Sequence, residues 1–279
     1  MPYKILDKAR LNSVTSKIVI EAPYIARNAR PGQFVVIHID EKGERIPLTI
    51  NDSNPKDGAI TIIFQGVGRT TCRLAALKKG GFVQDVLGPL GKAADFGRAG
   101  RVIFIAGGVG IAEILPVARY ARANNNIVTA VTGARTKELL ILEDEMRGAS
   151  DRLFIVTDDG SRGARGVVTG PLKELLDKEA FDLAYCVGPD IMMKFACGLT
   201  KQYNLKTLVS LDANMVDATG MCATCRVKVG GEVKFTCVDG PEFDGHLIDW
   251  DEFMKRQKRF VALEKRAMEY HGHKCRMPG

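Results

Sequence analysis

The sequence predicts a multidomain α+β protein, with an N-terminal antiparallel β-barrel, a doubly wound parallel α/β domain and a small cysteine-bearing domain. Short β-branched runs separated by turn residues fill the first hundred positions, and strand-like runs alternate with helical stretches after Gly100. Three of the seven cysteines then fall within 16 residues. The expected domains are residues 1–98, 99–211 and 212–246, followed by a C-terminal helix and tail over 247–279.

The first domain has the pattern of a barrel or sandwich built from short strands. Turn-rich pieces separate five expected strands, which cover Tyr3–Leu11, Ser16–Glu21, Gln33–Ile39, Ile46–Ile50 and Ala59–Phe64. One helix is expected over Thr70–Lys79, because leucines recur on one face and two glycines end the segment.

The second domain has the alternation of a doubly wound fold, in which ligands bind beyond the carboxyl ends of the strands. Expected strands cover Val102–Ala106, Ile127–Val131, Leu153–Thr157, Leu183–Val187 and Thr207–Leu211. The intervening helices are expected from the first glycine-rich turn to about Ala123, and over Thr136–Met146, Pro171–Lys178 and Ile191–Tyr203.

The composition excludes several classes of protein. A chain with 46% hydrophobic and 26% charged residues is neither disordered nor collagen-like. A net charge of +7 is too small for a dense basic surface, so no nucleic-acid partner is expected. The longest apolar stretch, Val102–Ala112, is shorter than the roughly 20 residues of a membrane span, so no membrane association is expected. The charged N-terminal segment lacks a signal-peptide core, and a reducing cytoplasm is the expected location.

The spacing Cys222-x2-Cys225-x11-Cys237 indicates a metal centre. A Cys-x2-Cys pair places two sulfurs on one tight turn, which is how a chain wraps a metal. Structural zinc normally takes a second pair of ligands, but here one cysteine follows, His246 is the nearest histidine and Cys275 is remote. An iron–sulfur cluster is therefore favoured over zinc and over cysteines that only pack in a core.

The stretch Met221–Cys225, together with Cys237–Phe243, resembles the [2Fe–2S] domain of dihydroorotate dehydrogenase B electron-transfer subunits. It is more similar still to the small subunits of the NADH-dependent reduced ferredoxin:NADP⁺ oxidoreductase (sulfide dehydrogenase) group, also of the ferredoxin reductase superfamily. Where the dihydroorotate subunits have a fourth cysteine, this chain has Asp217, as the oxidoreductase group does. Asp212 is a competing carboxylate. The resemblance implies that the cluster ligands are Asp217, Cys222, Cys225 and Cys237.

The segment Arg45–Ile50 resembles the flavin-binding motif of the same superfamily, in which an arginine and a hydroxyl residue bracket an apolar step on a barrel strand. The dihydroorotate subunits have the arginine directly before the proline, but here Ile46 occupies that place. Gly66–Thr71 leads into the expected helix, whose free N–H groups can bind a phosphate. The resemblance implies FAD contacts from Arg45, Pro47, Leu48, Thr49, Ile62, Phe64, Thr70 and Thr71.

The glycines of Gly107–Gly110 follow the first α/β strand and open a helix, which is where a dinucleotide phosphate lies. The segment is similar to the G-G-x-G-x-A step of ferredoxin reductases, although the family usually has proline at the position of Glu113. Asp158 and Asp159 follow the third strand and can accept hydrogen bonds from ribose hydroxyls, which favours NAD over NADP. Arg135 and Arg162 argue the other way, because arginine can bind the 2′-phosphate of NADP. Expected NAD contacts are Gly107, Gly108, Gly110, Glu113, Arg135, Asp158, Asp159, Gly188 and Pro189.

The resemblance implies an electron-transfer flavoprotein subunit that moves electrons between NAD(H), FAD and a [2Fe–2S] cluster. It also implies a heterodimer with a larger NADP-binding subunit that carries a second FAD and [4Fe–4S] clusters and couples to ferredoxin by electron bifurcation. The cofactors would do the chemistry, so no catalytic side chain is expected. Two alternatives are the electron-transfer subunit of an NAD-dependent dihydroorotate dehydrogenase, which Asp217 and Glu113 disfavour, and a zinc-stapled binding module without a redox role.

Overall fold

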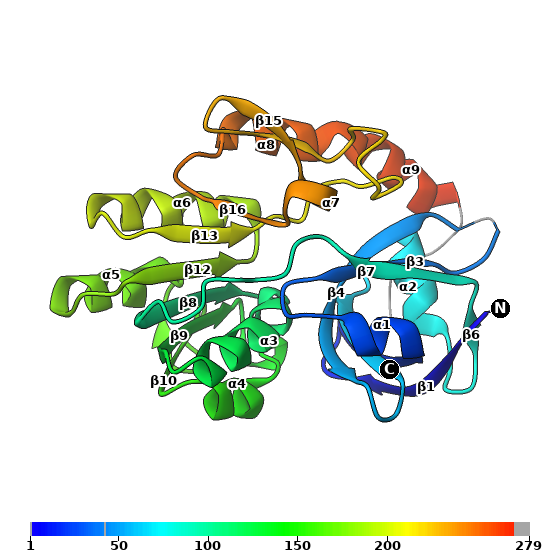
Figure 1. Cartoon of the computed structure of the whole chain (residues 1–279), viewed down its shortest axis with the longest axis horizontal. Helices are drawn as coiled ribbons and strands as arrows, with labels where there is room; N and C mark the ends of the chain where they lie inside the picture. Colours follow the sequence, from blue (N-terminus) through cyan, green and yellow to red (C-terminus); the bar gives the residue numbers. More distant parts are fainter. Residues whose placement is uncertain (1, 42, 271–279) are drawn as a thin grey trace.

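A computed structural model describes residues 2–41 and 43–270, and Figure 1 shows its three parts. The barrel lies at one end of the molecule and the α/β domain at the other, and the segment from about residue 212 runs across both. The expected tail beyond residue 270, with Cys275, lies outside the described residues.

The N-terminal domain is a nearly closed antiparallel barrel of seven strands in the order β6-β1-β2-β5-β4-β3-β7. Its two edge strands, β6 and β7, follow one another directly in the chain, so the curled sheet almost closes on itself. Isoleucines of β2 and β5 are fully buried inside it. The strands are β1 (Tyr3–Arg10), β2 (Thr15–Glu21), β3 (Phe34–His38), β4 (Arg45–Asn54), β5 (Ala59–Gln65), β6 (Phe82–Val83) and β7 (Asp85–Leu90).

Two short helices complete the barrel domain. Helix α1 (Pro23–Asn28), like the last two strands, was not predicted, because each of these segments buries too few residues to show a hydrophobic period. Helix α2 (Arg69–Ala76) ends three residues earlier than expected, at Leu77 in extended conformation. Its Leu74 is fully buried against the barrel.

The second domain is a seven-stranded sheet in the order β11-β10-β9-β8-β12-β13-β16, parallel except for the last strand. Helices α3 (Gly110–Ala123) and α4 (Glu143–Ala149) bury their apolar residues on one face, and α5 (Thr169–Lys178) and α6 (Asp190–Gln202) on the other. The doubly wound prediction is therefore confirmed. The parallel strands are β8 (Arg101–Gly107), β9 (Ile127–Ala134), β10 (Arg152–Thr157), β11 (Ala164–Arg165), β12 (Leu183–Val187) and β13 (Thr207–Ser210).

The predicted helix over Thr136–Met146 is wrong. A single 3₁₀ turn, η1 (Lys137–Leu139), is followed by extended chain, and Leu142 adopts a left-handed conformation with φ of 55° before α4 begins. Ile141 and Leu142 pack into the core beside α3, so burial of these two side chains outweighs helix propensity in this segment.

The C-terminal segment begins with a hairpin of β14 (Arg226–Val229) and β15 (Glu232–Phe235), followed by α7 (Thr236–Asp239). Strand β16 (Glu242–Asp244) then pairs with β13, which fastens the cysteine-bearing segment to the α/β sheet.

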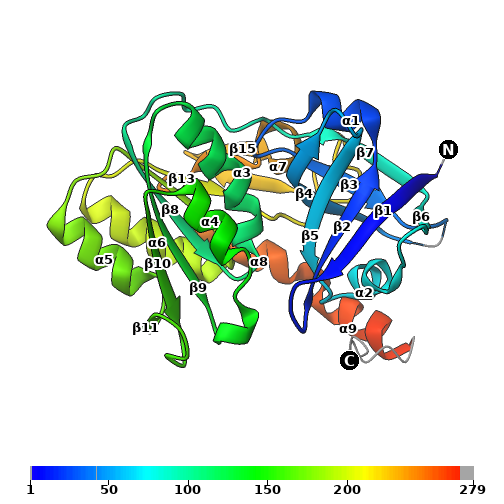
Figure 2. The ribbon, with the colours of Figure 1, turned by 90° about the horizontal axis from the view of Figure 1, so that it is seen from below.

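Helix α8 (Trp250–Gln257), the 3₁₀ turn η2 (Lys258–Phe260) and α9 (Val261–Tyr270) follow, and α9 lies beside α2 of the barrel (Figure 2). No helix within residues 2–41 and 43–270 is long and apolar enough to cross a membrane.

Candidate functional site

A cavity of about 940 Å³ lies between the barrel, the first turn of α3, the segment after β13 and helix α9. This volume suits a large organic cofactor. Six residues predicted to contact FAD line the cavity, namely Arg45, Pro47, Leu48, Thr49, Phe64 and Thr71. Strand β4 therefore presents its predicted motif to the cavity.

Two other residues predicted for FAD lie elsewhere. Ile62 is fully buried in the barrel interior, and its neighbour Ile63 lines the cavity. The Thr70 hydroxyl donates to Glu44 Oε2 at 2.5 Å. Thr71 does border the cavity, and its hydroxyl oxygen accepts from the Gly68 N–H at 2.9 Å at the start of α2.

The glycine-rich turn after β8 meets the Gly-Pro turn after β12. Strand β8 lies at the centre of the sheet, with β9, β10 and β11 on one side and β12 and β13 on the other. In doubly wound sheets the ligand binds in the crevice at this point, where the strand order reverses. A Cβ on Gly110 would lie 2.4 Å from the Val187 carbonyl oxygen, and one on Gly188 would lie 3.0 Å from the Gly107 nitrogen. The two turns therefore need glycine because backbone approaches backbone.

The remaining predicted NAD contacts lie at the ends of the neighbouring strands. Arg135 follows β9, and Asp158 and Asp159 follow β10, all three exposed. Asp159 Oδ1 accepts from the Ser161 hydroxyl at 2.6 Å, and this hydrogen bond lowers the pKa of Asp159. Arg162 Nη2 forms an ion pair with Glu143 Oε1 at 2.6 Å, so its guanidinium is already bound to a carboxylate at the start of α4.

Glu113 joins the α/β domain to the cavity. It lies in the first turn of α3, and the Thr49 hydroxyl donates to its Oε2 at 3.2 Å. Burial raises the pKa of Glu113 to about 8, with a further contribution from the charge of Asp212 and opposition from the Thr49 hydrogen bond. Asn51 holds this turn against the barrel by donating to the Ala112 carbonyl at 2.6 Å.

Sequence reasoning did not find the acidic group to which Glu113 belongs. Burial raises the pKa of Asp212 to about 6, helped by the charge of Asp190. Asp212 lines the cavity, and part of its surface is open to water. The three carboxylates come from positions 113, 190 and 212, and no sequence spacing reveals that the charge of one raises the pKa of the next.

The loop over residues 211–225, the cysteine loop, carries three of the four predicted cluster ligands and has two non-glycine residues in left-handed conformation. These are Ala218, with φ of 59°, and Ala223, with φ of 54°, each directly after a predicted ligand. Residues held in such sparsely populated regions concentrate at functional sites. The conformation lets the Asp217 carboxylate accept from the backbone N–H groups of Thr219 at 2.8 Å and Cys222 at 3.0 Å.

Cys225 and Cys237 are buried and interact directly. Thr236 holds them together, because its hydroxyl donates to the Cys225 carbonyl at 2.9 Å and its N–H donates to the same oxygen at 3.2 Å. Burial, then the Cys225 thiol, raises the pKa of Cys237 to about 12, and the charge of Asp217 acts in the same direction. Two thiols and a carboxylate therefore lie within electrostatic reach of one another.

These residues fit an iron–sulfur cluster by donor type, and Asp217, Cys222 and Cys225 share the cysteine loop while Cys237 lies in α7. Cys222 is exposed, and hydrogen bonds from Thr224 lower the pKa of its thiol although its partial burial acts the other way. Among the residues that the structure describes, no three cysteine, histidine or carboxylate side chains already converge as a metal site. Cluster binding would therefore reorient side chains on the loop.

The turn over Cys222–Cys225, the cysteine turn, borders the cavity. Thr224, between Cys222 and Cys225, lines it together with Val109 and Glu113 from the opposite wall. One cavity therefore contacts the barrel motif, the glycine-rich turn and the cysteine turn. This fold and site define the class of ferredoxin reductase-like oxidoreductases in which a barrel domain, a pyridine nucleotide domain and an iron–sulfur domain share one chain.

Comparison with known proteins agrees with this class. Residues 104–198 match the family model of the oxidoreductase NAD-binding domain, and residues 212–249 match that of the iron–sulfur cluster binding domain of dihydroorotate dehydrogenase B. The chain therefore carries an NAD-binding domain and an iron–sulfur cluster binding domain.

Similar proteins span nearly the whole chain. A Thermotoga maritima homologue of the dihydroorotate dehydrogenase B (NAD⁺) electron transfer subunit is 45% identical, over 95% of this chain and 94% of its own length. An uncharacterized Clostridium beijerinckii protein encoded in the adh 3′ region is 46% identical, over 95% and 93% respectively. A chain from the structure of an NADH-dependent reduced ferredoxin-NADP oxidoreductase has a TM-score of 0.93 and 42% identity, over 98% of this chain and 99% of its own.

The chain belongs to the family of dihydroorotate dehydrogenase B electron transfer subunits and their homologues. The family predicted from the cysteine motif is thereby confirmed.

Proposed function

We propose that the protein is the electron-transfer flavoprotein subunit of an NADH-dependent reduced ferredoxin:NADP⁺ oxidoreductase complex. FAD occupies the barrel cavity, NAD(H) binds at the glycine turns, and a [2Fe–2S] cluster binds in the cysteine loop. The observation that carries this proposal is the shared cavity, because Glu113 and Thr224 bring the nucleotide domain and the cysteine turn to its walls. FAD would supply hydride acceptance and single-electron transfer.

The barrel residues would bind and orient the flavin. Pro47, Leu48 and Thr49 present strand backbone and a hydroxyl to the cavity, and Phe64 gives it an apolar wall. Arg45 is exposed at the cavity edge, where a guanidinium can neutralise a pyrophosphate. The functional division expected from the sequence, with FAD on 1–98, NAD(H) on 99–211, the cluster on 212–246 and the C-terminal helix and tail on 247–279, stays a prediction.

Asp217, Cys222, Cys225 and Cys237 would hold the cluster. A carboxylate oxygen is a harder donor than a thiolate and suits ferric iron. Asp217 already points into the loop, since the Cys222 N–H donates to it at 3.0 Å. Ligand type and local charge set the potential of such clusters, so an aspartate in place of a fourth cysteine would shift it.

A larger partner subunit would cover the cysteine loop. Apolar side chains surround the loop and are open to water, with Met221 exposed by 87%, Val216 by 56% and Val238 by 40%. Exposed apolar groups in one place are typical of an interaction surface. The similar chain of known structure comes from work on flavin-based electron bifurcation. The proposed partner accordingly carries a second FAD and [4Fe–4S] clusters, binds NADP and passes electrons to ferredoxin in the cytoplasm.

A second candidate is the electron-transfer subunit of a dihydroorotate dehydrogenase, because the Thermotoga maritima relative is named as a homologue of that subunit. Co-purification from the native host separates the two. A partner with [4Fe–4S] clusters and NADPH activity supports the first function, and a partner that oxidises dihydroorotate supports the second.

Anaerobic purification of the full chain tests the proposal. We expect bound flavin, two iron atoms per chain as a [2Fe–2S] cluster requires, and an electron paramagnetic resonance (EPR) signal after dithionite reduction. NADH should bleach the flavin absorbance. A colourless protein that contains zinc would contradict the proposal and favour a structural zinc module.

A further inference from the structure

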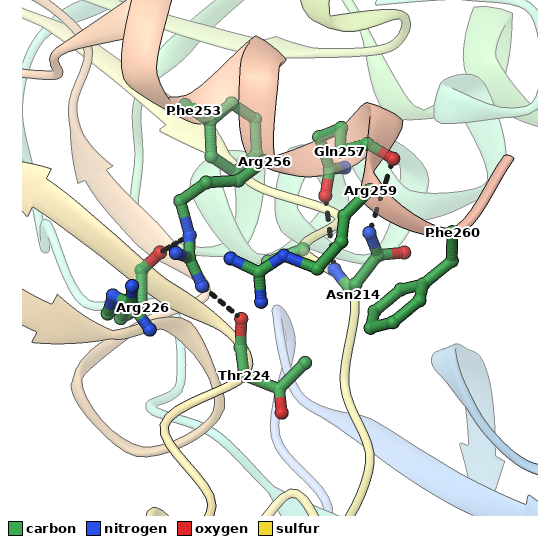
Figure 3. Close-up of a pocket in the computed structure, with 9 residues that line it drawn as sticks. Asn214, Thr224, Arg226, Phe253, Arg256, Gln257, Arg259 and Phe260 are labelled. Carbon is green, nitrogen blue, oxygen red and sulfur yellow. Dashed lines mark hydrogen bonds between the residues drawn. The ribbon is translucent and has the colours of Figure 1, made fainter.

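The last turn of α8 contacts the cysteine turn through one arginine. Figure 3 shows the Arg256 guanidinium reaching two backbone carbonyls, with Nε donating to the Arg226 oxygen at 3.1 Å and Nη2 donating to the Thr224 oxygen at 2.9 Å. These are the carbonyls on either side of Cys225. A single planar, permanently charged guanidinium therefore holds the Thr224–Cys225 peptide and the Arg226–Val227 peptide, one on each side of a predicted ligand.

The Cys225 carbonyl is also held. It accepts from the N–H and the hydroxyl of buried Thr236, so three consecutive carbonyl groups of the turn have fixed partners. Thr236 belongs to the same local segment as Cys237, whereas Arg256 comes from a helix some 30 residues further along the chain. Arg256 is thus the long-range contact that fixes this turn.

The next residue of α8 holds the wall of the cavity. The Asn214 N–H donates to Gln257 Oε1 at 3.1 Å, Asn214 Nδ2 donates to the Gln257 carbonyl at 3.3 Å, and Gln257 Nε2 donates to the Asp212 carbonyl. Asp212, Asn214 and Thr224 all line the cavity. Two adjacent residues of one helix therefore set the position of the cysteine turn relative to the cavity wall.

The charge of Arg256 acts on the same turn. Burial lowers the pKa of Arg256, as do the nearby guanidinium groups of Arg226 and Arg259, whereas Glu252 and Cys225 act in the other direction. The two hydrogen bonds to the carbonyls beside Cys225 place the Arg256 charge at this turn. A fixed positive charge beside a cluster ligand stabilises the reduced, more negative state of an iron–sulfur cluster, and therefore raises its reduction potential.

We propose that Arg256 is a positioning residue for the iron–sulfur cluster, which fixes from α8 the backbone carbonyls of Thr224 and Arg226 on either side of Cys225 and raises the reduction potential of the cluster. This inference rests on the proposed function, because it requires the cluster to be bound in the cysteine loop. It assigns to the C-terminal helix a part in electron transfer, beyond packing against the body of the protein.

The test is an EPR-monitored redox titration of the anaerobically purified full chain and its variants. Arg256→Gln should make reduction of the cluster about tenfold less favourable, which is a fall of 59 mV for a one-electron couple. Arg256→Lys keeps the charge but not the planar fork. It should stay near the wild-type potential and lose iron to a chelator several times faster than wild type.

Arg259→Gln is the matched control. Arg256 and Arg259 both line the small pocket of Figure 3, and Arg259 lies over the Phe260 ring at 5.9 Å. Its replacement takes away a nearby charge and leaves both Arg256 hydrogen bonds. It should shift the potential by less than half as much and leave iron release unchanged.

Wild-type potential together with wild-type iron release in Arg256→Gln would overturn the inference, as would an equal shift in Arg259→Gln. If Arg256→Gln cannot be purified with a cluster, iron release from Arg256→Lys decides, and a wild-type rate overturns the inference. A wild-type protein without a paramagnetic cluster would instead contradict the proposed function itself.

Discussion

The dinucleotide crevice and the cysteine loop are built in different ways. The crevice is made of backbone, where parallel strands end and two turns approach so closely that only glycine fits at Gly110. The cysteine loop is irregular chain with left-handed alanines, and side chains from elsewhere hold it. A site made of backbone can be recognised in the sequence from a few consecutive residues, whereas a site held by distant side chains cannot.

The largest expected effect tests the cysteine loop. Asp217→Ala should lose most of its bound iron, because the loop would lose both a proposed ligand and the acceptor for two backbone N–H groups. Asp217→Cys should keep the cluster with a shifted potential. Iron content and visible absorbance of the two purified variants decide, and an alanine variant with wild-type iron would remove Asp217 from the ligand set.

The next effect tests the crevice. In Gly110→Ala the new Cβ would collide with the Val187 carbonyl, so we expect a loss of roughly 2–4 kcal/mol in the free energy of unfolding and weaker NADH binding. Gly170→Ala in α5 is the control, because a Cβ there meets nothing within 4 Å. Urea denaturation of both measures the difference, and equal stability would show that the crevice tolerates side chains.

A third prediction concerns the carboxylate between the two regions. The folded-state pKa of Glu113 is about 8, against 4.5 as its ordinary value, so the folded protein keeps a proton that the unfolded chain loses. Stability should therefore fall as the pH rises from about 4.5 through 8. Glu113→Gln cannot ionise, so its free energy of unfolding relative to that of wild type should increase over this pH range.

The size of that gain follows from the pKa shift. One pKa unit corresponds to about 1.4 kcal/mol, and part of the shift is relieved by water in the cavity, so we expect roughly 1–2 kcal/mol at pH 9 and almost none at pH 4. Thermal melts at both pH values measure it. A difference that does not depend on pH would mean that Glu113 is ionised in the folded protein at neutral pH.

The smallest expected effect concerns nucleotide choice at the rim of the crevice. Asp158 is exposed at the end of β10, where its carboxylate can accept a ribose hydroxyl. A hydrogen bond is worth about 1 kcal/mol, so Asp158→Ser should raise the KM for NADH roughly fivefold and narrow the preference over NADPH. Steady-state kinetics with both nucleotides measure this, and an unchanged ratio would place the ribose elsewhere.

What could be predicted from the sequence follows the same division between regular backbone and contacts of distant side chains. The strands of both domains and the glycine turns carry periodicity and spacing in the sequence, and the structure has them within a few residues. The short pieces α1, β6 and β7 were missed because they bury too few residues to show a period.

Contacts between distant residues could not be predicted. The 136–146 segment leaves the helical conformation to bury Ile141 and Leu142 against α3, and the sequence does not say which surface they face. The contacts of Arg256 and the interaction of Glu113 with Asp212 are equally hidden, since each joins residues that lie 30 or more positions apart along the chain. Of the cluster site, therefore, the sequence predicts the ligands and not what holds them.

One measurement tests the central claim most directly, that the shared cavity carries electrons from NADH to the cysteine loop. Oxidised, cluster-loaded full chain is mixed anaerobically with NADH, frozen within one turnover and examined for flavin bleaching and for the EPR signal of the reduced cluster. The account predicts both signals in wild type and only flavin bleaching in Asp217→Ala. A bleached flavin beside a cluster that stays oxidised in wild type would contradict it.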